Sequence, residues 1–168
     1  MSLKLIKRLF RHLFIWPGAV SKHLPTDSMR RIEAAIAKSE KSHLGEICFV
    51  VEENLHVFDI IIKKSAKKRA IEVFSQFHVW DTEHNNGVLI YLLLADHDFE
   101  ILADRGIHYY VGNEGWEEIS RAMEAYFKQG DFEVGVLHGI AEIAEHLNTH
   151  FPADIENINE LANAPIVI

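Results

Sequence analysis

The chain has 168 residues, of which 48% are hydrophobic and 25% charged, values typical of one soluble globular domain with a sizeable core. The single cysteine, Cys48, excludes an intrachain disulfide and lies in an apolar run, so we interpret it as a buried core residue. The net charge is −8, but residues 1–31 carry +6 and the remainder carries −14, which disfavours nucleic acid as a partner and favours cations.

The first predicted element is a basic amphipathic helix over residues 3–15. Its apolar side chains recur at three- and four-residue spacing: Leu3, Leu5, Ile6, Leu9, Phe10, Leu13 and Phe14. Basic residues interrupt this stretch, unlike a secretory signal, and no apolar run approaches the ~18 residues that span a bilayer. The helix either docks on the domain or on a partner chain, or it lies on an anionic membrane surface. We expect a cytoplasmic protein, with peripheral attachment to the inner membrane as the second alternative.

The next elements alternate between helix and strand. Residues 25–28 supply capping residues for a helix that runs to about Ser42, and Gly45 breaks it. The apolar run 46–51 predicts a buried strand. Residues 54–62 favour a loop that leads into a helix, and a helical pattern then continues from about Ile61 to Phe77.

The second half of the chain begins with its most hydrophobic segment. Residues 88–95 are apolar on both faces, as expected of a central strand covered by helices. A tight connection at 96–98 leads into an antiparallel strand at 99–103, and helices are predicted near 116–127 and 133–147. We expect the tail from Pro152 to pack loosely.

This order of elements predicts an α/β fold, a three-layer α/β/α sandwich with a small mixed β-sheet, plus the N-terminal amphipathic helix. The predicted organisation is a basic helix and linker over residues 1–24, a domain over 25–152, and a C-terminal tail over 153–168.

Standard catalytic motifs are absent from the sequence. It contains no Gly-rich phosphate loop, no GxSxG elbow, no HExxH pair, no CxxC and no EF-hand loop. The eleven histidines are scattered, and only His146 and His150 form a helical pair with an acid nearby, so zinc is not favoured.

Oxygen-bearing side chains gather instead at predicted strand ends, and they suit Ca²⁺ or Mg²⁺. Asp81, Asn85 and Asn86 precede the central strand, and Asp104 follows its antiparallel partner, so these two segments should be neighbours. Glu46 joins them if the first strand runs parallel to the central one. The alternative is that all are solvated turn residues, with Asp104 and Arg105 forming a surface pair.

Several motifs together resemble the TPM domain family, sometimes called TPM phosphatase, in its short bacterial form. They are HLGEI at 43–47, KKRAIEVFSQF at 67–77, VWDTEHNNGVLIYLLLADHDFEILADRGI at 79–107, GDFEVGVLHGI at 130–140, and Trp116, Met123 and Phe127. The resemblance covers about residues 25–152. It implies an α/β/α sandwich, Ca²⁺ binding and, from plant thylakoid relatives, acid phosphatase activity. It also implies a cation site at Asn86-Gly87 and the preceding Asp81 loop.

Two functional hypotheses follow. The first is a non-enzymatic module that binds Ca²⁺ rather than Mg²⁺ and docks on an unknown protein partner or an anionic membrane surface through residues 3–15. The second is a metal-assisted acid phosphatase, in which Glu46, Asp81 and Asp104 hold the ion and Arg105 clamps the phosphate oxygens. The acidic body, the basic helix and the lack of a nucleophile constellation favour the first hypothesis.

Overall fold

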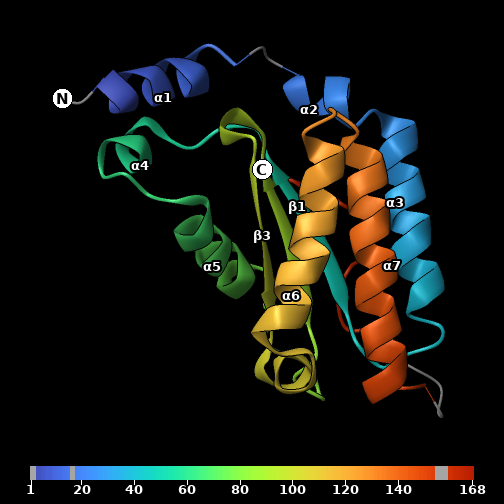
Figure 1. The fold of residues 1–168 in the computed structure, drawn as a ribbon. Helices are drawn as coiled ribbons and strands as arrows, with labels where there is room; N and C mark the ends of the chain where they lie inside the picture. Colours follow the sequence, from blue (N-terminus) through green and yellow to red (C-terminus); the bar gives the residue numbers. More distant parts are fainter. Residues whose placement is uncertain (1–2, 16–17, 154–158) are drawn as a thin grey trace.

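A mixed β-sheet lies between two layers of helices in the computed structural model, which describes residues 3–15, 18–153 and 159–168 (Figure 1). Within these residues the sheet has four strands in the order β3-β2-β1-β4. β1 (Ile47–Glu52) runs parallel to β2 (Val88–Leu93), which pairs antiparallel with β3 (Asp98–Ala103). The predicted three-layer α/β/α sandwich is confirmed.

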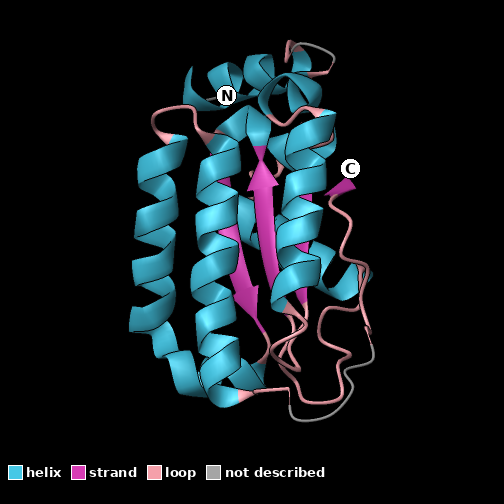
Figure 2. Ribbon diagram, turned by 90° about the vertical axis from the view of Figure 1, so that its right-hand side faces the viewer, coloured by secondary structure: helices cyan, strands magenta, loops and turns pink. Residues whose placement is uncertain are grey.

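The two central strands are buried on both faces, so their side chains alternate between two apolar clusters. Phe49 and Ile90 belong to the cluster that packs under α3 (Thr26–Ser39), α6 (Arg105–Phe127) and α7 (Phe132–His150), the layer that faces the viewer in Figure 2. Val50 and Tyr91 belong to the second cluster, which packs under α5 (Ala66–Gln76). Cys48 lies in this second cluster, and burial raises the pKa of its thiol to about 12, in agreement with a structural role.

The C-terminal segment differs from the sequence prediction. Residues 166–167 form β4 (Ile166–Val167), which pairs in parallel with β1, and Ile168 N–H donates to the Val51 carbonyl at 3.0 Å. Ile166 and Ile168 also pack against the second cluster. The prediction of a loosely packed tail is therefore wrong for residues 166–168, because the free edge of β1 offers unpaired main-chain groups to an apolar strand. Residues 154–158 lie outside the described part.

The helices also depart from the prediction in their boundaries. The pattern expected from Ile61 to Phe77 is divided into α4 (Val57–Ile61) and α5, with Lys63 in the left-handed region at φ 58° and Ser65 capping α5. Ile62 is consequently exposed rather than part of the core. α6 is broken at Gly112, which has the non-helical angles φ 66° and ψ 177°, so the helix predicted near 116–127 is preceded by a shorter helical segment that begins at Arg105. The short helix α2 (Ala19–His23) was not predicted.

The N-terminal helix α1 (Leu3–Leu13) lies across one end of the sheet beside α4 (Figure 1). Leu5 and Leu9 pack against the second cluster, and His12 is 4% exposed. The helix is held at the 3-10 turn η1 (Leu94–Asp96), where Asp96 pairs with Arg8. None of the helices in the described residues is long and apolar enough to cross a membrane.

Candidate functional site

The predicted cation ligands lie at the end of the sheet opposite α1, where the strands β1 and β2 begin and β3 ends. β1 and β2 are parallel with Ile47 opposite Val88, so Glu46 lies beside the start of β2. Val88 N–H donates to the Glu46 carbonyl at 2.8 Å, and Asp104 N–H donates to the Gly87 carbonyl at 2.9 Å. The structure therefore brings Glu46, residues 86–87 and Asp104 to one edge, as the parallel arrangement requires.

Asn86 ties two loops together at this edge. The residue is fully buried, its N–H donates to Thr82 Oγ1 at 3.1 Å, and its Nδ2 donates to the Leu44 carbonyl at 3.1 Å. Its remaining polar atom, Oδ1, is buried and has no hydrogen-bond partner among the described residues. Asn86 therefore acts as a structural bridge and also presents one unsatisfied acceptor.

Asp104 occupies the N-cap position of α6, and its Oδ1 accepts the Arg105 N–H at 2.7 Å. The Asn85 carbonyl accepts the next two N–H groups of the helix, those of Gly106 at 2.8 Å and Ile107 at 3.3 Å. Asn85 adopts φ 53°, a left-handed conformation that asparagine tolerates, to present this carbonyl. Asp104 Oδ2 is buried and, within the described ranges, unpartnered.

Glu46 is fully buried, and both of its carboxylate oxygens are engaged. Oε1 accepts the Glu160 N–H at 3.2 Å, and Oε2 accepts the Leu161 N–H at 3.2 Å. Burial raises the pKa of the Glu46 carboxyl although these two N–H groups favour the charged form. Glu46 thus fastens the C-terminal segment over the start of β1, a role that the sequence did not indicate.

Glu40 is a second buried carboxylate at this edge and was missed by the sequence analysis. It follows the last residue of α3, its Oε1 accepts the Ile47 N–H at 3.0 Å, and its Oε2 accepts the Asn163 side-chain amide. Burial, together with the charge of Glu46, raises the pKa of Glu40 to about 7. In the sequence Glu40 stands at a polar helix end, so no local pattern marks it as buried.

The other predicted site residues face solvent. The Asp81 and Arg105 side chains are exposed, so the structure does not bring either one into the buried edge. The described residues contain no group of three or more His, Cys, Asp or Glu side chains that could hold a metal ion. Any ion bound here would need amide, carbonyl or water oxygens in addition to carboxylates.

Comparison with known proteins assigns the chain to a family. The family model described as the TPM domain, named TPM phosphatase, matches residues 21–146. No curated protein matches the chain.

Among solved structures, the NMR structure of the BA42 protein from the psychrophilic bacterium Bizionia argentinensis is 31% identical. It aligns over 86% of this chain and 95% of its own, with a TM-score of 0.77. The N-terminal domain of a P. gingivalis protein is 15% identical over 76% of this chain and 79% of its own, with a TM-score of 0.61, and shows the shared fold alone. The chain belongs to the TPM domain family.

Proposed function

We propose that this chain is a non-enzymatic binding module that takes a divalent cation, Ca²⁺ in preference to Mg²⁺, at the edge formed by residues 81–87 and Asp104. The observation that carries the proposal is the pair of buried oxygens, Asn86 Oδ1 and Asp104 Oδ2, which lack partners among the described residues. Buried polar atoms in native proteins are nearly always satisfied, and carboxylate and amide oxygens are ligands for hard cations.

The residue types favour Ca²⁺ over Mg²⁺. Ca²⁺ accepts about six to eight oxygen ligands in flexible geometry, and carbonyl and water oxygens complete its shell, whereas Mg²⁺ requires near-octahedral geometry. In this proposal Asp104 supplies the charged ligand and Asn86 the neutral one, and the half-buried Asn85 on the adjoining loop is a further oxygen donor, whereas the exposed Asp81 is not assigned as a ligand. Glu46 is assigned a supporting role, because both of its oxygens already accept main-chain N–H groups.

The phosphatase alternative finds less support at this edge. A phosphate bound at the start of a helix needs free main-chain N–H groups. The first three N–H groups of α6 already donate to Asp104 and Asn85. The Arg105 side chain, the candidate phosphate clamp, is exposed.

The test is a thermal melt of the EDTA-treated protein with and without millimolar Ca²⁺, Mg²⁺ or Zn²⁺. A ligand present at about 100 times its dissociation constant stabilises the fold by ~2.7 kcal/mol, which raises the melting temperature by roughly 5–10 °C for a domain of this size. Asp104→Asn is the informative variant, because asparagine also caps a helix but removes the charge of the proposed ligand.

Asp131→Asn provides the matched control. Asp131 is the N-cap residue of α7, it is exposed, and its side chain makes no capping hydrogen bond. We expect a Ca²⁺-dependent shift in the wild type and in Asp131→Asn, and a loss of that shift in Asp104→Asn. A melting temperature that no ion changes, or a Ca²⁺ shift that persists in Asp104→Asn, would overturn the proposal.

A further inference from the structure

One end of the molecule carries a concentration of exposed apolar side chains on two neighbouring helices. On α1 and directly after it, Leu3, Phe10, Leu13 and Phe14 are 53% to 74% exposed. On α4 and directly after it, Phe58, Ile61 and Ile62 are 53% to 62% exposed. The helices α1 and α4 contact each other. We call these seven residues the apolar end surface.

The opposite side of α1 is already used by the domain. Leu5 and Leu9 pack into the second apolar cluster, and buried His12 accepts the Leu55 N–H on Nδ1 at 2.9 Å. The apolar pattern of α1 is therefore divided between an inward face that packs on the domain and an outward face.

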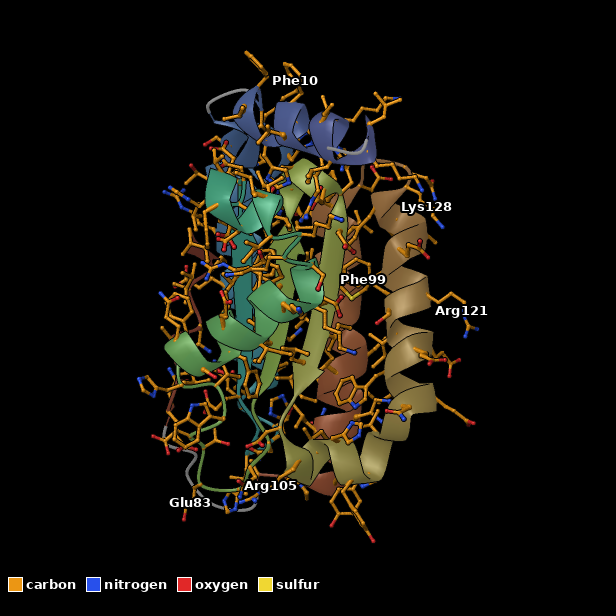
Figure 3. All side chains as sticks on the ribbon, turned by 90° about the vertical axis from the view of Figure 1, so that its left-hand side faces the viewer. Phe10, Glu83, Phe99, Arg105, Arg121 and Lys128 are labelled. Atoms are coloured by element: carbon orange, nitrogen blue, oxygen red, sulfur yellow. The ribbon has the colours of Figure 1, made fainter. Side chains whose placement is uncertain are left out.

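The outward face is ordered. Positions 3, 10 and 14 fall on one side of a helix of 3.6 residues per turn. The rings of Phe10 and Phe14 stack with centroids 5.5 Å apart. Figure 3 shows Phe10 on the side of α1 that points away from the sheet. The ion pairs of Asp96 with Arg8 and Arg11 fix the helix in this orientation.

Basic residues accompany the apolar end surface. Lys4 and Lys7 are exposed on α1, and Lys63 is exposed just after α4. Lys67 and Lys68 are exposed in the first turn of α5. Residues 1–31 carry a net charge of +6, whereas residues 32–168 carry −14. A negatively charged surface therefore attracts the α1 side of the chain and repels most of the remaining body, which orients the molecule as it approaches.

We propose that the apolar end surface binds the face of an anionic lipid bilayer, with α1 and α4 both lying at the level of the headgroups. Helices with exposed Phe and Leu beside lysines bind such interfaces through buried apolar area together with attraction to anionic lipid. The sequence pattern predicted a membrane-binding helix at residues 3–15 alone, and the structure adds α4 to the same surface. The proposal is independent of the cation site, which lies at the opposite end of the sheet, near Glu83 and Arg105 in Figure 3.

The experiment is co-sedimentation of the full-length protein with vesicles of phosphatidylcholine and phosphatidylglycerol in a ratio of about 3:1, and with vesicles of phosphatidylcholine alone. We expect binding to the anionic vesicles that weakens as salt screens the lysines. Two double variants test the two helices: Phe10→Ser with Phe14→Ser for α1, and Phe58→Ser with Ile61→Ser for α4. Each should lower the partition coefficient of the protein between vesicles and water at least about tenfold. Lys4→Gln with Lys7→Gln should lower it by an order of magnitude or more, at about fivefold per charge.

Tyr109→Ser is the control, because Tyr109 is 82% exposed but lies on α6 near the opposite end of the sheet, and binding should stay unchanged. Melting temperatures report whether each serine variant folds. If one of them does not fold, the variant Lys4→Gln with Lys7→Gln still tests the proposal. Wild-type protein that fails to pellet with anionic vesicles, or variants that bind as the wild type does, would overturn the proposal. The protein could also fail to pellet but self-associate, and the double variant Phe10→Ser with Phe14→Ser could abolish that self-association. This result would overturn the proposal too, and it would assign the surface to a second copy of the chain.

Discussion

Glu46 and Leu161 are joined by a hydrogen bond from the Leu161 N–H to the Glu46 carboxylate at 3.2 Å, across 115 positions of the sequence. The neighbouring Glu160 N–H donates to the other oxygen of the same carboxylate. Because both oxygens are used, this buried side chain is a principal attachment of the C-terminal segment, in addition to the short strand β4.

Glu46→Ala should release that segment. The substitution removes the acceptor of two part-buried hydrogen bonds, and a hydrogen bond to a charged group contributes about 1.5–3 kcal/mol. We expect the free energy of unfolding in urea to fall by about 2–4 kcal/mol, and the amide of Leu161 to exchange with solvent much faster. Glu46→Gln keeps one acceptor oxygen and should lose less. Unchanged protection of the Leu161 amide in Glu46→Ala would show that β4 alone holds the segment.

Glu40 should make the fold less stable as the pH rises. Burial raises its folded-state pKa from the ordinary 4.5 to about 7, so between these values the unfolded chain has released a proton that the folded chain keeps. The contribution of Glu40 to the free energy of unfolding is therefore complete below pH 4.5 and is lost as the pH rises to about 7, a change of up to about 3 kcal/mol. Glu46, whose pKa is also raised, should add to this slope.

Glu40→Gln should remove most of this dependence. The glutamine oxygen can still accept the Ile47 N–H, and no buried charge develops at high pH. In urea unfolding we expect the variant to be more stable than the wild type at pH 8 and similar to it at pH 4.5. Parallel pH profiles for the two proteins would contradict the role assigned to Glu40.

Much of the fold could be predicted because its signals are local. The apolar runs at 46–51 and 88–95 indicated buried strands, and the turn at 96–98 indicated an antiparallel partner, as observed. β4 was missed because two residues at the end of a polar tail carry little periodicity. Only the free edge of β1, formed by a distant part of the chain, makes Ile166 a strand residue.

The candidate site was predictable to a smaller extent. Strand order was sufficient to bring Glu46, Asn86 and Asp104 to one edge. It could not show that the Asp81 side chain faces solvent, since loop conformation decides that. Glu40 could not be found, because its burial depends on contacts with β1 and with Asn163, 123 positions away.

Asp96 should control whether α1 stays on the domain. Burial disfavours its charge, but hydrogen bonds from His12 and Arg8 outweigh this and hold its pKa at about 2. The contribution of the Asp96 carboxylate to the free energy of unfolding is therefore complete at neutral pH and is lost as the pH falls from about 4 toward 2. At pH 7 we expect Asp96→Asn to lower the free energy of unfolding by about 1–3 kcal/mol and to speed hydrogen exchange throughout α1.

Asp27→Asn is the matched control for Asp96, since Asp27 pairs with Arg30 on the surface and both side chains are 75% exposed. This variant should unfold as the wild type does. If Asp96→Asn left exchange in α1 unchanged, then the packing of Leu5 and Leu9, rather than the ion pairs, would hold the helix.

Gly106 should not tolerate any side chain, because the 81–87 loop packs against the start of α6 and leaves no space there. A Cβ at this position would lie 2.5 Å from the Asn85 carbonyl oxygen and 2.7 Å from that of His84. Alanine favours a helix by up to about 1 kcal/mol over glycine, but two main-chain contacts this short require the loop to move. We expect Gly106→Ala to destabilise the fold by about 2–3 kcal/mol and to weaken any Ca²⁺-dependent rise in melting temperature. Gly115→Ala, in the part of α6 beyond the break at Gly112, is the comparison, since its Cβ would meet side-chain atoms of Val111 alone, with the methyl Cγ1 at 2.6 Å. Val111 can rotate away, so Gly115→Ala should stay within about 1 kcal/mol of the wild type, and equal losses in the two variants would show that helix packing, not the contact with the 81–87 loop, sets the effect.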